Sequence, residues 1–336
     1  MPHDPIARRQ LLLAAGALCL AGRPVHAETF PAKPIRIVVP FPAGGATDAG
    51  GRILAGALTT RLKQPVVVEN LGGANGGIGA ESVARSKADG HTLLFTSMGT
   101  LVMNPPIYKN QRLQPMRDLA PVAKVFDTPL VVEARPDRNL RTLENLIARA
   151  KADPGKLTYA SGGNGASSHM AAELFQFHTK TRLTHVPYKG NGPALLDVLG
   201  GQVDVMFDQV ASSQQHILSG KLKAMAVTSP RRLPGLPDVP TVGELGYPDL
   251  EMSSWASLTA PQGTPKEVIE VISRATLASL QDPGVRERFE KTGAIVAAGD
   301  PAGLAALLKA ETDRWGKGIR APAITADCWR RRSTPA

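Results

Sequence analysis

A stretch near the start of the chain, residues 38–48, changes from a strand pattern to a helix pattern through two adjacent glycines. The apolar run over 35–39 stops at Pro40, passes Gly44 and Gly45, and gives way to a helical pattern from about Thr47. This order leaves backbone N–H groups unpaired at the positive end of a helix dipole, with no Cβ in the way of a ligand. The junction suits a carboxylate or a phosphate, and the alternative is a tight turn that binds nothing.

The same arrangement occurs a second time, in residues 157–170. A predicted strand over 157–161 runs directly into Gly162, and apolar residues then recur at helical spacing. We expect Ser167 and Ser168 to cap this helix and to offer hydroxyl and backbone donors. His169 either faces a ligand or makes a local bond in the first turn. Each half of the chain therefore carries one candidate anion-binding turn.

Strand and helix patterns alternate along the chain, which predicts parallel sheets and an α/β fold. A length of 336 residues is more than one hydrophobic core usually supports, so we expect two domains. Strands are expected over 121–126 and 129–133, and the first domain is expected to end between them. The glycines at 72–79 match neither a dinucleotide fingerprint nor a phosphate loop, so neither nucleotide site is predicted.

Polar residues follow the third predicted strand, which covers residues 92–96. Ser97 and Thr100 lie at its carboxyl end, the edge where open α/β sheets bind ligands, although they could also merely cap the next turn. An irregular excursion is expected over 104–115. Further on, one helix is expected to begin with Pro193 at its first position, and a capping box over residues 264–267 predicts another helix start.

The first 27 residues have the pattern of an export signal. Arg8 and Arg9 precede an uncharged apolar run, and the segment closes at Ala27. The run is too short to span a membrane. The arginine pair also permits a twin-arginine signal, but we favour the general secretory route.

Charge and cysteine content exclude several kinds of site. The net charge is +10, but the positive residues are spread along the chain, which argues against nucleic-acid binding and favours attraction of small anions. Of the two cysteines, Cys19 leaves with the signal and Cys328 has no intramolecular partner. We therefore expect no disulfide framework, no metal site and no cofactor.

Six longer motifs follow one another between about Phe30 and Ile319. They read P-F-P-A-G-G-A-T-D, V-E-N-x-x-G-A-N-G-G-I-G-A-E, D-G-H-T-L-L-F-T-S-M-G-T, T-Y-A-S-G-G-N-G-A-S-S-H-M-A-A-E-L-F, V-P-Y-K-G-N-G-P-A-L-L-D-V-L-G-G-Q-V-D and P-D-V-P-T-V-G-E-L-G-Y. In this order they resemble a Bug-type extracytoplasmic solute receptor, the substrate-binding component of tripartite tricarboxylate transporters.

The resemblance implies a two-domain periplasmic-binding-protein type II fold, with two doubly wound sheets and a ligand cleft between them. After the signal (1–27), domain 1 would comprise residues 28–126 and 253–336, and domain 2 residues 127–252. The protein would be a periplasmic monomer without catalytic activity. It would bind a small carboxylate, such as a di- or tricarboxylate, an acidic amino acid or an aromatic acid, and deliver it to membrane permease subunits.

Carried over residue by residue, the resemblance implies ligand contacts from both domains. The first-domain contacts would be Phe41, Gly44, Ala46, Thr47 and Asp48, with Ser97 and Thr100 beside them. The second-domain contacts would be Ser161, Gly162, Gly165, Ser167 and Ser168, with Asp208 facing the cleft. Backbone amides, hydroxyls and water would hold the ligand, in keeping with the absence of Arg or Lys from both glycine loops.

The chain departs from the family pattern at Gly50 and Gly51, at Asp208, and in the tail after Gly318, which is divergent. Gly50 and Gly51 replace ordinary helix formers, at a cost of about 1 kcal/mol each relative to alanine. Asp208 stands where an amide is common, and its carboxylate would repel an anionic ligand unless protonated or paired. Asp48 has two interpretations, a helix cap or a ligand contact, and we favour the ligand contact.

Two alternatives to a transport receptor stay open at this point. A serine hydrolase would use Ser161, Ser167 or Ser168 with His169 or His185, but no G-x-S-x-G elbow is present. A receptor that signals to a sensor protein would share the same fold, so the sequence does not separate it from a transport receptor.

Overall fold

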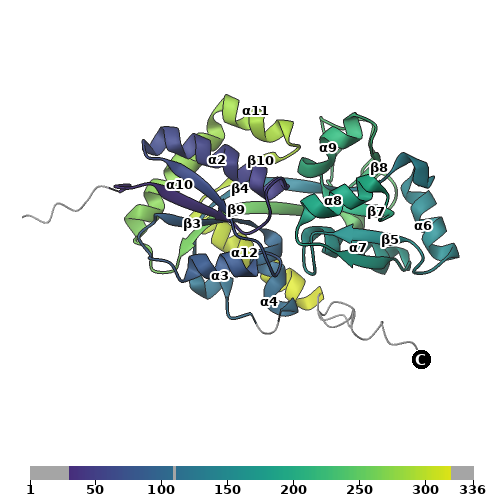
Figure 1. Cartoon of the computed structure of the whole chain (residues 1–336), viewed down its shortest axis with the longest axis horizontal. Helices are drawn as coiled ribbons and strands as arrows, with labels where there is room; N and C mark the ends of the chain where they lie inside the picture. Colours follow the sequence, from purple (N-terminus) through teal and green to yellow (C-terminus); the bar gives the residue numbers. More distant parts are fainter. Residues whose placement is uncertain (1–29, 109–110, 319–336) are drawn as a thin grey trace, which may run out of the picture.

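The computed structural model describes residues 30–108 and 111–318. Figure 1 shows two α/β lobes side by side, one formed by the start and end of the described chain and the other by its middle. Within the described residues the strands form one connected set, in the order β2-β1-β3-β9-β4-β7-β5-β6, with β8 and β10 also paired to β4. The α/β fold class is confirmed. The predicted export signal, Cys328 and the divergent tail lie outside the described residues.

The first lobe surrounds parallel strands β1 (Ile35–Val39), β2 (Val66–Asn70) and β3 (Thr92–Ser97). Strand β9 (Ser253–Pro261) runs antiparallel to β3, and β10 (Ile295–Gly299) pairs with β4 (Leu119–Ala134). The helical elements of this lobe are α2 (Ala46–Leu62), α3 (Gly77–Ala84), η1 (Gly99–Met103), α4 (Asn104–Ile107), α5 (Pro115–Asp118), α10 (Lys266–Gln281), α11 (Pro283–Lys291) and α12 (Pro301–Gly318).

The second lobe surrounds β5 (Thr158–Ser161), β6 (Thr184–Pro187) and β7 (Val205–Gln209), which are parallel to one another. Strand β8 (Lys223–Val227) pairs with β4. The helical elements of this lobe are η2 (Pro136–Arg138), α6 (Leu143–Ala152), α7 (Ser167–Thr179), α8 (Asn191–Gly200), α9 (Val210–Leu218) and η3 (Pro248–Leu250).

The long strand β4 connects the two lobes. The prediction of two separate strands here was wrong, because Asp127 and Thr128 continue the ladder by pairing with Trp255 and Ser254 of β9. The part of β4 up to Pro129 pairs with β9, and the part from Leu130 pairs with β7 and β8. The proposed domain boundary after residue 126 thus falls inside one strand, and the division into two domains stays a proposal.

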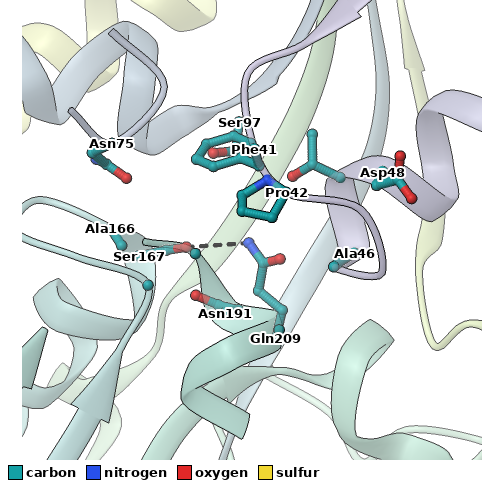
Figure 2. Close-up of a pocket in the computed structure, with 15 residues that line it drawn as sticks. Phe41, Pro42, Ala46, Asp48, Asn75, Ser97, Ala166, Ser167, Asn191 and Gln209 are labelled. Atoms are coloured by element: carbon teal, nitrogen blue, oxygen red, sulfur yellow. Dashed lines mark hydrogen bonds between the residues drawn. The ribbon is translucent and has the colours of Figure 1, made fainter. Parts of the chain in front are cut away.

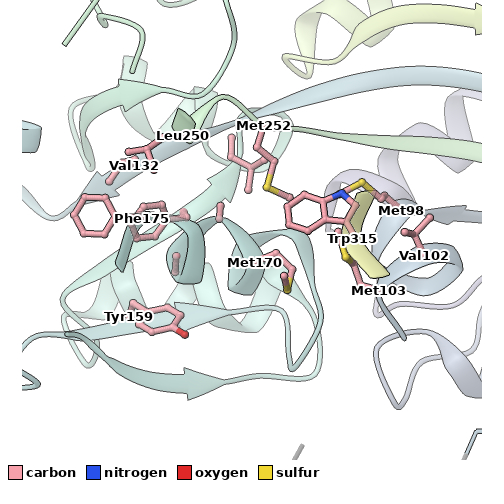
Figure 3. Close-up of a cluster of buried hydrophobic side chains, with 14 of the residues drawn as sticks. Met98, Val102, Met103, Val132, Tyr159, Met170, Phe175, Leu250, Met252 and Trp315 are labelled. Carbon is pink, nitrogen blue, oxygen red and sulfur yellow. The ribbon is translucent and has the colours of Figure 1, made fainter. Parts of the chain in front are cut away.

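Two large apolar clusters hold the fold together. One lies in the first lobe and includes Leu54 and Phe95. The other extends from Met98 in the first lobe to Phe175 in the second. Figure 3 shows Trp315 of α12 beside Met98 and Met252 in this second cluster. The lobes therefore share buried apolar contacts as well as the strands that cross between them.

The glycines at 50 and 51 have a packing explanation. A Cβ on Gly50 would lie 2.4 Å from a ring carbon of Phe126, and one on Gly51 would lie 2.8 Å from the side chain of Val39. Helix α2 therefore packs against the sheet more closely than alanine would permit. This close packing offsets the conformational cost of two glycines inside a helix.

Several local predictions were wrong. Ala166 occupies the N-cap of α7 without a side-chain bond, so Ser167 and Ser168 are the first helical residues rather than caps. The expected capping box at 264–267 does not form, because Thr264 Oγ1 donates to Pro261 O and Pro265 takes the N-cap position of α10. Helix α8 begins at Asn191, before Pro193. The stretch expected to be irregular contains short helical segments.

Candidate functional site

The first glycine turn leads from β1 into α2 as predicted. Gly44 has a φ of +92°, a conformation that favours glycine, and Gly45 is the N-cap without a side-chain bond. Helix α2 then begins at Ala46, and its first-turn N–H groups have no acceptor within the helix. These N–H groups are the donors that this turn can offer to an anion.

Asp48 lies in the first turn of α2 and is almost fully buried. Its carboxylate accepts hydrogen bonds from Gly44 N at 3.0 Å, from Asn70 Nδ2 at 2.9 Å and from Arg52 Nε at 3.1 Å. Burial alone would raise the pKa of Asp48, but the hydrogen bonds from Arg52, Gly44 and Asn70 outweigh it and lower the pKa. Asp48 is therefore an ionised group whose charge is compensated by Arg52.

The second glycine turn uses its own N–H groups internally. Gly162 N donates to Ser168 Oγ at 3.0 Å, and Gly163 N donates to Ser161 Oγ at 3.1 Å. Gly165 N donates to His169 Nδ1 at 3.0 Å, which settles the alternatives for His169 in favour of a local bond. The loop is therefore held in shape by these side chains, and the free donors are the first-turn N–H groups of α7.

A third helix N-terminus lies at the same place. Gly190 is the N-cap of α8, with a φ of +126°, and Asn191 is the first helical residue. The starts of α2, α7 and α8 all line one cavity of about 40 Å³. Figure 2 shows Ala46, Asp48, Ala166, Ser167 and Asn191 around this cavity. Three positive helix ends that meet in one cavity favour an anionic ligand.

A second cavity of about 190 Å³ adjoins the first. The two have five lining residues in common, namely Phe41, Pro42, Asn75, Gly162 and Gly190. Tyr108, Tyr188 and Lys189 line only the second cavity. A ligand longer than the first cavity therefore has space to continue into the second.

The structure divides the predicted site residues into two groups. The residues that line the first cavity are Phe41, Ala46, Thr47, Asp48, Ser97, Gly162 and Ser167. The residues that do not line it are Gly44, Thr100, Ser161, Gly165, Ser168 and Asp208. Thr100 does not line the cavity but supports its wall, since Thr100 Oγ1 donates to Asn75 O at 3.0 Å and so helps to place Asn75.

Asp208 does not face the cavity, contrary to the prediction. Its side chain is fully buried beneath the second loop, where it accepts from Asn191 Nδ2 and from Gln209 N. Burial raises the pKa of Asp208 to about 7, against the lowering effect of the hydrogen bonds from Ser213, Gln209 and Asn191. The next residue, Gln209, lines the cavity instead, and its Nε2 donates to Ser167 Oγ at 3.2 Å (Figure 2).

Sequence reasoning missed several lining residues, namely Pro42, Asn75, Ala166, Gly190, Asn191, Gly192 and Gln209, whereas Gly45 is part of the predicted first glycine turn. The signal for Asn191 was present, because Gly190 and Gly192 flank it in a third glycine-rich turn before a helix. The signal for Gln209 was its place at the end of a buried strand, one residue beyond Asp208.

Behind the second loop, buried Ser161 and His169 form a cluster with His185, which is partly exposed. Ser161 Oγ lies 2.6 Å from His185 Nε2, and the rings of His169 and His185 stack with centroids 4.2 Å apart. Burial lowers the pKa of His169 to about 4. Burial and the charge of His169 lower the pKa of His185 to about 2. Both imidazoles are therefore neutral near pH 7, and stacking two neutral rings incurs no charge repulsion.

The described residues show neither a metal cluster nor a membrane span. Within 30–108 and 111–318, no three His, Cys, Asp or Glu side chains are grouped so that they could hold a metal ion. No helix in the same ranges is both long enough and apolar enough to cross a membrane.

Comparisons with known proteins agree on one family. The family model "Tripartite tricarboxylate transporter family receptor" matches residues 51–324. Protein BugT of Bordetella pertussis is 40% identical over 298 residues, which are 88% of this chain and 91% of BugT.

Two solved structures are similar along most of their length. The periplasmic binding protein BugD superposes with a TM-score of 0.84 at 38% identity, covering 88% of this chain and 99% of BugD. MatC from Rhodopseudomonas palustris, solved with bound malate, gives a TM-score of 0.82 at 33% identity and covers 87% of this chain and 100% of MatC. The chain therefore belongs to the tripartite tricarboxylate transporter receptor family, whose Bug-type members it resembles in sequence and in fold.

Proposed function

We propose that this protein binds a small carboxylate at the meeting point of α2, α7 and α8 and delivers it to the permease subunits of a tripartite tricarboxylate transporter. The observation that carries the proposal is the convergence of three helix N-termini on one cavity. Free N–H donors and aligned helix dipoles stabilise a carboxylate without a fixed cation. The malate bound to the related MatC is consistent with this ligand class.

The lining of the two cavities supports a ligand with one carboxylate in the first cavity and a second negative group in the second cavity. No Arg or Lys lines the first cavity, whereas Lys189 lines the second. The helix ends would bind one carboxylate, and the larger cavity would hold the rest of the molecule. Asp48 does not oppose this arrangement, because Arg52 lies 3.0 Å from its carboxylate and compensates its charge.

The burial of Ser161, the serine next to His185, supports a binding role without catalysis. Ser161 is fully buried, does not line either cavity, and uses its oxygen to accept the N–H of Gly163. Its neighbour His185 has a pKa too low for a general base near neutral pH. We propose a non-enzymatic receptor that works in the periplasm after export, by the general secretory route in preference to the twin-arginine route.

The test is a binding and turnover assay with a panel of acids. Malate, succinate, citrate, adipate, glutamate and benzoate, with the methyl esters of malate and adipate, would be screened by thermal shift and by product analysis. We expect at least one acid to raise the melting temperature, no effect from its ester, and no product. Product release that disappears in Ser161→Ala would overturn the proposal, as would binding of esters but not acids.

A charge substitution makes the test specific to the cavity. Ser167→Asp places a carboxylate among the three helix ends and should abolish binding of the acid found in the screen. Gln262→Glu adds the same charge on an exposed loop of the first lobe and should leave binding unchanged. Equal effects of the two variants would show that the cavity is not the binding site.

A further inference from the structure

Two buried acidic side chains lie next to each other beneath the second loop. Glu133 is in β4 and Asp208 is in β7, and both are fully buried. The residues that pair with Glu133 on the neighbouring strands are Met206 and Ala224, neither of which carries charge. No lysine, arginine or histidine among the described residues forms an ion pair with either acid.

One serine hydroxyl lies between the two acids. Ser213 Oγ is 2.7 Å from Glu133 Oε1 and 2.8 Å from Asp208 Oδ2. A hydroxyl has a single hydrogen to donate, and ionised carboxylates only accept. Both short contacts are hydrogen bonds only if one of the acids carries a proton and donates it to Ser213 Oγ. The geometry therefore requires one proton on the pair.

The hydrogen-bond partners decide which acid carries it. The carboxylate of Asp208 accepts from Asn191 Nδ2, from Gln209 N and from Ser213. Among the described residues Glu133 has Ser213 as its only hydrogen-bond partner, and its Oε2 is buried without any hydrogen bond. A buried negative charge needs donors, so it is far more stable on Asp208 than on Glu133.

We propose that Glu133 is a neutral acid which donates through Ser213 to an ionised Asp208, and that Asp208 is a positioning residue for the candidate ligand site. The role in positioning rests on the proposed function, whereas the assignment of the proton does not. Burial and the nearby charge of Asp208 both raise the pKa of Glu133, which agrees with this assignment.

The link to the cavity runs through Asn191. Because Asp208 is an acceptor, Asn191 must direct Nδ2 toward it, and Asn191 Oδ1 is then free to accept from Ser168 Oγ at 3.2 Å. Ser168 Oγ in turn accepts from Gly162 N. The charge of Asp208 thereby fixes the amide orientation of Asn191 at the start of α8 and, through Ser168, the position of Gly162 in the cavity wall.

Infrared difference spectroscopy tests the proton directly. A protonated carboxylic acid absorbs above the amide band, and this signal is read from the protein without any ligand. In mildly alkaline buffer we expect the band to be present in the wild type, to disappear in Glu133→Gln and to remain in Asp208→Asn. Loss of the band in Asp208→Asn but not in Glu133→Gln, or its absence from the wild type, would overturn the proposal.

Nuclear magnetic resonance of the Asn191 side-chain amide tests positioning. The resonance is assigned by its loss in Asn191→Ala, and a hydrogen bond to a carboxylate should shift one of its protons downfield. We expect this shift to decrease in Asp208→Asn and to disappear in Asp208→Ala. The control Asp153→Asn, at an exposed carboxylate of the same lobe, should leave it unchanged. If Asp208→Ala does not fold, the Asp208→Asn spectrum decides, and an unmoved resonance contradicts the proposal.

Binding of malate provides the functional readout. We expect Asp208→Ala to weaken malate binding by about tenfold or more, as expected for loss of a hydrogen bond to a charged group, and Asp208→Asn to weaken it less. If the wild type binds none of the acids in the panel, the proposed function fails, while the two spectroscopic tests still decide the proton and the orientation of Asn191. Unchanged malate affinity in Asp208→Ala would remove Asp208 as a positioning residue.

Discussion

Asp48 and Asp208 occupy comparable places in the two lobes but are stabilised in opposite ways. Each is buried next to a helix N-terminus that lines the cavity. Asp48 has a cation, Arg52, that reaches it from the surface, and its pKa is lowered. Within residues 30–108 and 111–318, no cation forms an ion pair with Asp208, which lies beside a second acid and has a raised pKa. One lobe therefore compensates a buried carboxylate with a salt bridge, and the other does so with hydrogen bonds and, as we propose, a proton on the neighbouring Glu133.

The difference predicts how each lobe responds to water and to pH. Arg52 is about half exposed, so solvent screens its charge and can replace part of its interaction. The partners of Asp208 are buried or part-buried protein groups, which water does not readily replace. The second lobe should accordingly be more sensitive to changes at its aspartate than the first lobe is.

The largest expected effect is the loss of Asp208. Asp208→Ala leaves three donors without their acceptor and should lower the free energy of unfolding by about 3 kcal/mol. Asp48→Ala should cost about 1–2 kcal/mol, because Arg52 can turn to solvent. Equilibrium urea unfolding of both variants measures the comparison. An Asp48→Ala protein that is less stable than Asp208→Ala would contradict it.

The sequence was informative about the first lobe's site because the signals there are local. The β-branched run of β1, the glycines after it and the helical pattern of α2 are adjacent in the chain, so the turn and its free donors followed from a single stretch. The same holds for β5 and the start of α7. Asp48 is a case that the local pattern left open: it lines the cavity and also accepts the N–H of Gly44, so its ligand role stays a prediction.

The remainder of the site depends on contacts between distant parts of the chain. Asn191 was missed because Pro193 suggested a later helix start, and only the fold brings the start of α8 beside Gly162. The partnership of Glu133 with Asp208 depends on the pairing of β4 with β7, which no local pattern encodes. The continuity of β4 likewise depends on its partner β9 rather than on its own residues.

The two aspartates should also give opposite dependences of stability on pH. Burial raises the folded-state pKa of Asp208 to about 7 from its ordinary value of 3.8, so Asp208 becomes the ionised partner of neutral Glu133 as pH rises through about 7. The stability that protonated Asp208 contributes is therefore full below 3.8 and is lost as pH rises through about 7. The pKa of Asp48 is lowered, so the stability that ionised Asp48 contributes is present above pH 3.8 and is lost as pH falls through its folded-state pKa.

This pH dependence is measured as a difference between wild type and variant. His169 and His185 have lowered pKa values, so they destabilise the fold as pH falls from 6.5 toward about 4. Both histidines are present in wild type and variant, so their effect on stability drops out of the difference. The unfolding free energy of wild type minus that of Asp208→Asn should fall as pH rises from about 4 to above 7. The corresponding difference for Asp48→Asn should stay constant over the same pH range. Parallel profiles for the two aspartates would contradict the comparison.

The smallest expected effect concerns Arg52, the cation that distinguishes the first lobe from the second. Arg52→Gln removes the charge but keeps an amide that can donate to Asp48 and Asn70, and the pair is partly exposed. We expect a loss of only about 0.5 kcal/mol in unfolding free energy. The pKa of Asp48 should rise because the hydrogen bond and the charge of Arg52 both lower it.

Binding of an anionic ligand to Arg52→Gln should weaken near neutral pH, since the charge of Asp48 is then uncompensated beside the cavity. Lys309→Gln, which removes an exposed cation from α12, is the matched control and should leave binding unchanged. Calorimetric titration of both variants with the acid found in the screen measures this effect, and unchanged affinity in Arg52→Gln would mean that hydrogen bonds alone compensate Asp48, as we propose for Asp208.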